Sequence, residues 1–504
     1  MYLSKYTFNL KYNKGIKKSL KLLFLLKKFI NNKRYLKQKE IENKEFLDNI
    51  NNIKLDENQR KIVLSEEDST LVIAGAGSGK SLTILARILY LVKNKIDPRD
   101  ILVISFTNDA CNSLKQKLIK NNINIEVLTF HKLGRRILKN NGYYVKLVED
   151  NILDNIIKKQ LEKQNLKDLI DIKNKNEIHN LQKLLKTFIN LFKSNGYQEN
   201  QFNHFLRQNK YEKGYNKKRH KILLLLAKQI YNKYECYLDK HKCIDFYDMI
   251  SKSINIVLKD GIYPYKYIIV DEYQDTSLIK CKLLMNIKKI TSASFLAVGD
   301  DFQSIYRFTG SNLNVFTDFN KYFPYSKVFK LTNTYRNSKE LLEITNKFIL
   351  KNPKQIYKNL TSKKTNKNPI YICYYENNYL SLVKKLKEKI NNVTILARNN
   401  QDLKSITNSM TVHKSKGLEF ENVIIVNLEN STTGFPNKIK NDKFLKYVLN
   451  LKEDYPYEEE RRIFYVALTR TKNNNYLLVN KNNPSLFVTE LLKENSNIKV
   501  LDLR

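Results

Sequence analysis

The stretch AGAGSGKS, residues 74–81, has the residue types and spacing of a phosphate-binding loop. It follows an apolar run at residues 71–73 and precedes the helical pattern SLTILARILYLV, which is the context such a loop requires. Glycines let backbone N–H groups turn toward phosphate oxygens, and a helix N-terminus adds a favourable dipole. Lys80 is expected to reach the β- and γ-phosphates, and Ser81 to hold Mg²⁺. The predicted ATP-binding loop comprises Ala74, Gly75, Ala76, Gly77, Ser78, Gly79, Lys80 and Ser81.

A second chemical signal is the acidic pair that ends the apolar run in YIIVDEYQD. A carboxylate at that position, Asp271, can hold Mg²⁺ directly or through water. The next one, Glu272, can orient and deprotonate an attacking water. Either acid alone would usually be a solvated loop residue. Together with a phosphate-binding loop, the pair indicates nucleoside triphosphate hydrolysis by positioning and charge neutralisation.

The elements that must position these residues are short apolar runs that end in polar or glycine-rich turns. Helical patterns separate the runs, so the sequence predicts parallel sheets in an α/β fold. Ligands of such sheets bind at the carboxyl ends of the strands, where the distinctive residues lie. The runs are TLVIAGAG, ILVISFTN, YIIVDE, FLAVGDD, VTILARNN, NVIIVN and NYLLVN.

Residues 139–240 have a different pattern, with helical apolar spacing and almost no strand signal. This segment is interpreted as a helical insertion in the first α/β domain. Two α/β blocks of similar size, before and after about residue 323, are candidates for related lobes. A chain of 504 residues has room for three or four domains.

The charge of the chain suggests a polyanionic partner. Its formal net charge is +40, from 90 Lys+Arg against 50 Asp+Glu, which favours nucleic acid over a membrane surface. A mutational bias toward Lys and Asn codons would produce the same composition, so charge alone leaves both explanations open. No apolar run reaches roughly 18 residues, and a membrane span is not expected. Five scattered cysteines without a C-x-x-C pair favour buried thiols in a reducing compartment.

The N-terminal segment, residues 1–50, is basic and amphipathic. A presequence, a membrane-surface helix and a nucleic-acid contact remain alternatives, and a short helical extension is the favoured interpretation. The expected location is the cytoplasm. An organelle or nucleoid association would follow if the segment were a presequence.

The full series of motifs resembles that of the UvrD/Rep-type superfamily 1A DNA helicases. LDENQRKIV is similar to their Q motif, AGAGSGKS to motif I, ISFTNDACNSLKQKL to motif Ia and TFHKLGRRIL to the DNA-contacting motif that follows. VDEYQDT resembles motif II, VGDDFQSIYRFTGS motif III, NTYRNSKELLEITN motif IV, TVHKSKGLEFENVIIV motif V and EEERRIFYVALTRTK motif VI. YRFTGS and TTGFP are similar to the DNA helicase IV-like subfamily. The resemblance runs from about residue 55 to 479, in family order.

This resemblance implies two RecA-like P-loop NTPase lobes with parallel sheets and a helical 1B-type insertion in the first lobe. The expected division is a basic extension at 1–50, lobe 1A at 51–138 and 241–323, the 1B insertion at 139–240, and lobe 2A at 324–504. The UvrD branch carries a 2B domain just before motif V. Only twelve residues separate Arg398 and Thr411, so a 2B domain is not expected here.

The resemblance also implies residue roles. Gln59 would read adenine and Tyr335 would stack on it, while Arg336 and Arg470 would be arginine fingers from the second lobe. Gln303 would lie between the γ-phosphate and the DNA groove, and it joins Glu272 in the catalytic set. The family motif has Trp-Arg where this chain has Phe308 and Thr309, so no role is carried over to Arg307. For Phe106 and Phe308, the alternative to a base-stacking role is burial in the hydrophobic core. The expected DNA contacts are Phe106, Thr107, Asn108, Thr129, His131, Phe308, Thr411 and His413.

The function implied is an ATP-dependent helicase that uses ATP and Mg²⁺, moves 3′→5′ on single-stranded DNA and unwinds duplex. Its expected partners are single-stranded DNA and single-strand/duplex junctions. One alternative is a translocase that strips proteins from DNA without efficient unwinding. Another is a DNA-binding adaptor with weak ATPase activity, and RNA is a less favoured substrate.

Overall fold

The computed structural model describes residues 34–163, 175–260, 263–449 and 455–502. Most of the predicted N-terminal extension, residues 1–33, therefore lies outside the described chain. Its remainder is helical at 34–42 and in α2 (Lys44–Asp48). Leu47 of α2 is fully buried and packs with Leu55 and Val63, so this end of the extension belongs to the first lobe.

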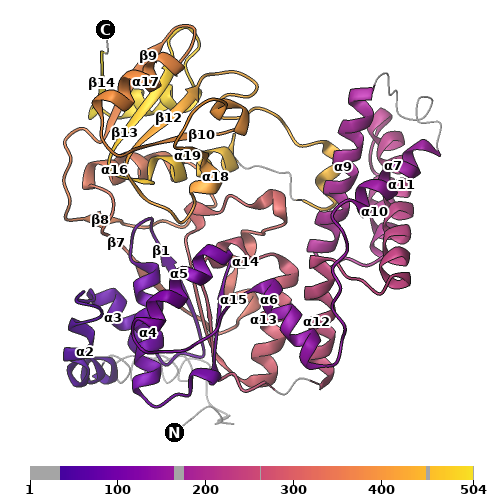
Figure 1. Ribbon diagram of the computed structural model, residues 1–504, viewed down its shortest axis with the longest axis horizontal. Coiled ribbons are helices and arrows are strands. Elements are labelled where there is room, and N and C mark those ends of the chain that lie inside the picture. Colours follow the sequence, from indigo (N-terminus) through magenta and orange to yellow (C-terminus); the bar gives the residue numbers. More distant parts are fainter. Residues whose placement is uncertain (1–33, 164–174, 261–262, 450–454, 503–504) are drawn as a thin grey trace, which may run out of the picture.

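The first lobe is built on a six-stranded, fully parallel sheet in the order β3-β2-β4-β5-β1-β6 (Figure 1). Apolar side chains on both faces of the sheet are covered by helices, as expected of a buried parallel sheet. The strands are β1 (Ser69–Ala74), β2 (Ile101–Ser105), β3 (Val127–Thr129), β4 (Tyr267–Val270), β5 (Ser294–Gly299) and β6 (Lys327–Leu331). The helices are α3 (Glu57–Leu64), α4 (Lys80–Lys93), α5 (Asn108–Ile119), α6 (Phe130–Asn140), α12 (Phe246–Asp260), α13 (Leu278–Thr291), α14 (Asn314–Thr317) and α15 (Phe319–Tyr322).

The second lobe repeats this architecture with a parallel sheet in the order β11-β10-β12-β13-β9-β14. Its strands are β9 (Ile370–Tyr375), β10 (Val393–Ala397), β11 (Ser409–Thr411), β12 (Phe420–Leu428), β13 (Thr471–Asn480) and β14 (Ile498–Val500). Its helices are α16 (Lys339–Ile349), α17 (Leu380–Lys389), α18 (Val412–Ser415), α19 (Glu458–Leu468) and α20 (Leu486–Glu494). Two parallel-sheet lobes of this kind confirm the predicted α/β, RecA-like fold. Residues 398–408 connect β10 directly to β11, at the place where the UvrD branch carries its 2B domain.

A separate helical domain stands beside both lobes (Figure 1). It contains α7 (Ile152–Glu162), α9 (Lys175–Ser194), α10 (Gln201–Asn209) and α11 (Gly214–Lys240), all within the segment predicted to be a helical insertion. Its aromatic core is built around Phe188, Phe192 and Phe202. Phe444 and Tyr447, which come from the second-lobe part of the sequence, are part of the same core.

One boundary predicted from sequence differs from the structure. The sequence places residues 327–331 in the second lobe, yet they form β6, which pairs with β1 at the edge of the first sheet. Most of its side chains are exposed, as at an edge strand, and its register comes from a partner more than 250 residues away along the chain. A local apolar pattern carries no information about that pairing. The lobes therefore meet after β6, at the short parallel pair β7 (Asn333–Thr334) and β8 (Thr361–Ser362).

No helix in the described ranges is both long and apolar enough to cross a membrane.

Candidate nucleotide site and DNA groove

The phosphate-binding loop leaves β1 and ends where Lys80 begins α4. Gly77 and Gly79 have φ values of +69° and +79°, in the left-handed region that favours glycine. A Cβ on Gly79 would lie 2.6 Å from Gln59 Nε2, and one on Gly77 would lie 2.5 Å from Arg336 Cβ. The loop is therefore closely approached by α3 on one side and by the second lobe on the other.

The predicted acidic pair lies at the carboxyl end of β4, beside this loop. Lys80 Nζ is 3.2 Å from Glu272 Oε1, which joins the loop lysine to the predicted catalytic base. Burial and the neighbouring Glu272 raise the pKa of Asp271. Burial also acts to raise the pKa of Glu272, but Lys80, Lys416 and Gln274 together lower it. Glu272 is therefore the carboxylate that stays ionised, as a general base must.

The predicted adenine-side residues meet next to the loop. Asp56 caps α3, and Gln59 completes a capping box by accepting from the Asp56 backbone N–H. Gln59 is 1% exposed, and within the described part of the chain its Nε2 donor has no hydrogen-bond partner. Tyr335 donates its hydroxyl to Asp56 Oδ2 at 2.8 Å and keeps half of its surface exposed. The structure thus brings a free amide donor and an open aromatic face to the same end of the loop.

The two predicted arginine fingers reach this place from the second lobe. Arg470 is 1% exposed and donates through Nη2 to Gln303 Oε1 at 2.9 Å, a contact that crosses between the lobes. Burial and the nearby Arg336 lower the pKa of Arg470 to about 9. Arg336 pairs with Glu419 at 3.0 Å and donates to the Thr469 carbonyl at 3.2 Å. Two guanidinium groups thus converge next to the phosphate-binding loop.

Gln303 links Arg470 to Asp300, which follows the carboxyl end of β5. Its Nε2 donates to Asp300 Oδ2 at 2.6 Å, while its Oε1 accepts from Arg470. The acids Asp300 and Asp301 are fully buried and are compensated by Lys358, which is 1% exposed and 2.7 Å from Asp301 Oδ1. Sequence reasoning missed Lys358, because a single lysine in a polar connection carries no local signal.

Sequence reasoning also missed Lys416, although it lies inside the quoted motif TVHKSKGLEF. Its Nζ pairs with buried Asp275 and donates to the Gln303 carbonyl at 2.6 Å. Lys416 therefore links the second lobe to the strand-end segments after both β4 and β5. The available signal was the position of Lys416 inside motif V. Its partners, Asp275 and Gln303, could not be identified from the sequence.

Four of the predicted DNA-contacting positions line up with an unpredicted tyrosine across the lobes. Phe106 stacks on Tyr306 with ring centroids 5.2 Å apart, and Tyr306 lies 6.1 Å from Phe308. Phe308 packs edge-on against His413 at 5.5 Å, and Tyr306 donates its hydroxyl to the His413 carbonyl at 3.2 Å. Thr411 directly precedes the short helix α18, which carries His413. The 57% exposure of Phe308 excludes the alternative that it is a core residue, whereas Phe106 is half-buried against Tyr306.

The remaining predicted DNA positions lie at helix N-termini of the first lobe. Thr107 caps α5 by accepting from the Ala110 N–H, and Asn108 is the exposed first residue of that helix. Thr129 caps α6 in the same way and is buried. His131 packs against Phe246 with ring centroids 5.1 Å apart, and burial together with Lys280 lowers its pKa to about 4.

A groove of about 1310 Å³ runs past this aromatic row. Its walls include Phe308, Thr411 and His413 from the predicted set. Two acids line it, but Glu459 is paired with Arg307 at 2.8 Å and Glu460 with Arg398 at 2.7 Å. These pairings reduce the negative charge that the groove presents to a phosphate backbone. They also give Arg307 a protein partner.

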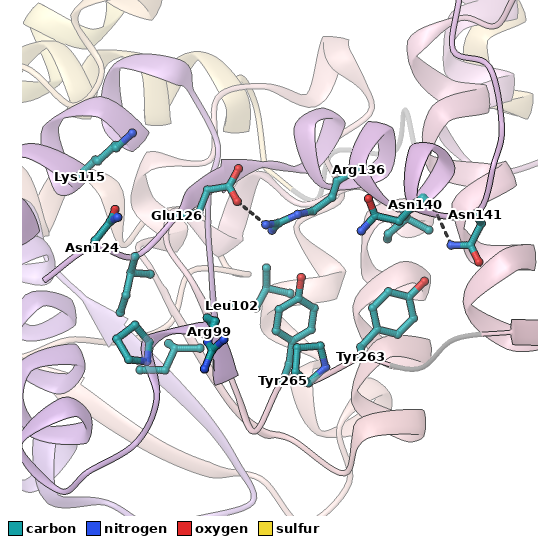
Figure 2. Close-up of a pocket in the computed structure, with 15 residues that line it drawn as sticks. Arg99, Leu102, Lys115, Asn124, Glu126, Arg136, Asn140, Asn141, Tyr263 and Tyr265 are labelled. Carbon is teal, nitrogen blue, oxygen red and sulfur yellow. Dashed lines mark hydrogen bonds and ion pairs between the residues drawn. The ribbon is translucent and has the colours of Figure 1, made fainter.

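A second pocket, of about 670 Å³, lies at the end of the first sheet opposite to the phosphate-binding loop and is drawn in Figure 2. It is lined by Arg99, Tyr263 and Tyr265, and by Arg136, which pairs with Glu126. The tyrosines precede β4 and Arg99 precedes β2, so the pocket faces the amino ends of these strands. None of the predicted site residues lines it. Parallel sheets bind their ligands at the carboxyl ends of the strands, so the candidate nucleotide site remains the one beside Lys80.

Two RecA-like lobes with a phosphate loop on one and arginines on the other define a class of P-loop NTPase whose lobes share one nucleotide site. The UvrD/REP helicase N-terminal domain model matches residues 55–324, and the UvrD-like helicase C-terminal domain model matches residues 408–482. The chain belongs to the UvrD/REP helicase family.

Individual relatives agree with this assignment. DNA helicase IV of Escherichia coli is 29% identical, with 92% of this chain and 73% of the relative covered. ATP-dependent DNA helicase PcrA of Leuconostoc citreum is 28% identical over 70% of this chain and 48% of the relative. ATP-dependent DNA helicase Rep of Buchnera aphidicola subsp. Baizongia pistaciae is 28% identical over 60% and 45%. The chain thus spans about half of the PcrA and Rep relatives and more of helicase IV.

Proposed function

We propose that this protein is an ATP-dependent DNA helicase that moves 3′→5′ along single-stranded DNA and separates duplex at single-strand/duplex junctions. The observation that carries the proposal is the contact of Arg470 with Gln303, 2.9 Å long, between the second lobe and the strand end next to the phosphate loop. It joins an arginine finger to the segment that also carries Phe308. Nucleotide state and DNA grip can therefore be coupled within one short stretch of chain.

In this proposal the nucleotide site binds ATP with Mg²⁺. The backbone N–H groups of residues 75–79 and the Lys80 ammonium would hold the phosphates, and Tyr335 and Gln59 would hold the adenine. Ser81 and Asp271 offer the hard oxygen ligands that Mg²⁺ prefers, alongside phosphate oxygens. The cation would neutralise developing charge when bound. Glu272, ionised and 3.2 Å from Lys80, would accept the proton of the attacking water.

Lobe closure follows from where the charges are. Arg336 and Arg470 belong to the second lobe, so attraction to the γ-phosphate pulls this lobe toward the first. Hydrolysis and phosphate release remove that attraction, and the lobes separate. Arginine fingers in related phosphoryl transfers contribute on the order of 10³–10⁵ in rate. Alternating closure moves the groups on the two lobes that would grip DNA, Phe106 and Thr107 on one and Thr411 and His413 on the other.

Strand displacement on tailed duplexes tests the proposal. We expect unwinding of a duplex with a 3′ single-stranded tail, little unwinding with a 5′ tail, and none by Lys80→Ala, because that change removes the phosphate ligand. Efficient unwinding from 5′ tails alone would refute the direction. Undiminished unwinding by Lys80→Ala would refute the site.

A second candidate function is removal of bound proteins from DNA during translocation. It is favoured by the direct connection of β10 to β11 through residues 398–408, where the UvrD branch has its 2B domain. A single-stranded track that ends in a tightly bound streptavidin distinguishes the two functions. ATP-driven release of streptavidin without strand displacement on tailed duplexes would favour this second function.

A further inference from the structure

Residues 429–449, which follow β12, leave the second lobe and dock into the helical domain. We call residues 429–449 the strap. Figure 1 shows it crossing from the second lobe toward α9 and α10. Phe444 is fully buried there, and its ring stacks on Phe188 with centroids 4.5 Å apart. Tyr447 donates its hydroxyl to Asn209 Oδ1 at 3.0 Å. The strap thus completes the helical core.

Polar contacts fix the strap at both ends. At the helical domain, Arg219 forms a two-point pair with Asp442, at 3.0 and 2.7 Å, and Lys446 pairs with Glu212. At the second lobe, the Asn437 N–H donates to Glu460 Oε2 at 2.9 Å. Fork-shaped arginine–carboxylate pairs add geometric specificity as well as energy. The strap is therefore a built connection between two domains.

The strap also forms one wall of the groove that holds Phe308, Thr411 and His413. Lys440 and Lys443 on the strap are exposed and line this groove, as does Thr187 of α9. Lysines along a groove are the expected contacts for a phosphate backbone. The strap therefore lies over the path that the proposed function assigns to DNA.

The other joints complete a ring around this path. Lys193 of α9 is buried and lies 2.8 Å from Asp245 and 2.9 Å from Asp248, which fixes the helical domain to the first lobe. The first lobe meets the second through Lys416 and Gln303, as described above. Together these contacts join the first lobe, the helical domain, the strap and the second lobe into a ring.

We propose that the strap is a clasp that closes the groove into a ring and encloses single-stranded DNA. This inference rests on the proposed DNA-binding function. An enclosed strand cannot leave sideways and must slide off a free end. The clasp must open at the helical domain for DNA without ends to enter. Opening breaks the Lys446–Glu212 and Asp442–Arg219 pairs and withdraws Phe444 and Tyr447 from the helical core.

A cross-link across the clasp tests the enclosure. The full chain carries Glu212→Cys and Lys446→Cys, with the exposed Cys236 replaced by serine. A short bismaleimide is added after the protein has bound either closed circular or linear single-stranded DNA of the same sequence. Both complexes are then washed in high salt, which removes protein held only by phosphate contacts.

We expect the cross-linked protein to stay on circles, in proportion to the cross-linked fraction, and to be lost from linear DNA. The matched control places cysteines at Asp154 and Lys186, whose ion pair at 2.7 Å joins two helices within the helical domain. That cross-link should retain protein on neither DNA. Equal loss from circles and linear DNA, or equal retention on both, would overturn the clasp.

The same samples separate failure of the clasp from failure of the proposed function. Binding to linear single-stranded DNA in low salt, before cross-linking, reports on the function alone. Absence of that binding would refute both proposals together. Low-salt binding followed by loss from circles would refute only the clasp.

Discussion

The change Gln303→Ala tests the coupling between the lobes at one contact. In the structure, Arg470 is 1% exposed and donates to Gln303 Oε1 at 2.9 Å. Its other hydrogen bonds, to the carbonyls of Val466 and Leu418, stay within the second lobe. Gln303→Ala therefore leaves the guanidinium buried but removes an anchor to the first lobe.

The magnitude follows from the charge of the donor. A hydrogen bond to a charged group contributes roughly 1.5–3 kcal/mol, and about 1.36 kcal/mol is tenfold in rate, so kcat for DNA-stimulated ATP hydrolysis should fall roughly 10- to 150-fold. The assay is steady-state ATP turnover at saturating single-stranded DNA. KM for ATP should change less than kcat, because the contact positions a group that acts in the transition state.

A matched control is Gln355→Ala. Gln355 is also buried and also bridges an acid and an arginine, donating to Asp301 at 2.8 Å and accepting from Arg462 at 3.2 Å. Among the described residues it forms no hydrogen bond with Arg470, so kcat should fall much less. Equal losses in both variants would show that any damage to this polar network slows turnover. An unchanged kcat in Gln303→Ala would refute the coupling.

Two further predictions concern DNA grip and pH. Phe308→Ala should weaken single-stranded DNA binding by roughly 1–3 kcal/mol, and Phe308→Trp should retain the affinity, since base stacking needs an aromatic face. Fluorescence anisotropy measures the affinity of the wild type and both variants. Equal affinity in all three proteins would exclude stacking. Burial, with Arg398, lowers the pKa of His413 to about 4, below its unfolded value of about 6.5. Wild type should therefore lose stability relative to His413→Gln as the pH falls from 6.5 to 4, by about 3 kcal/mol at most. Thermal unfolding of both proteins across this range measures the difference, and a constant difference would contradict the burial of a neutral imidazole.

The residues at strand ends could be predicted from sequence because local signals specify them. The loop around Lys80 needs glycines between a strand and a helix, and Glu272 follows a short apolar run of the kind that forms a buried strand. The resemblance then supplied Arg336 and Arg470, which no local pattern could have paired with Lys80. Their convergence depends on the packing of two lobes.

What could not be predicted depends on contacts between distant segments. β6 is an exposed edge strand whose membership of the first sheet is decided by β1. Lys358 became visible only through the buried acids it compensates. The apolar residues around Phe444 form a run too short to show a period, and their burial depends on a domain encoded more than 200 residues earlier.

The most direct test of a two-lobed, DNA-driven ATPase is ATP turnover by the full chain without DNA, with single-stranded DNA and with blunt duplex. Wild-type turnover should rise strongly with single-stranded DNA and much less with blunt duplex. Glu272→Gln should abolish it under all three conditions, because the amide that replaces the carboxylate could not accept the proton of the attacking water. An ATP turnover rate that does not change when DNA is added, or that persists in Glu272→Gln, would contradict the account.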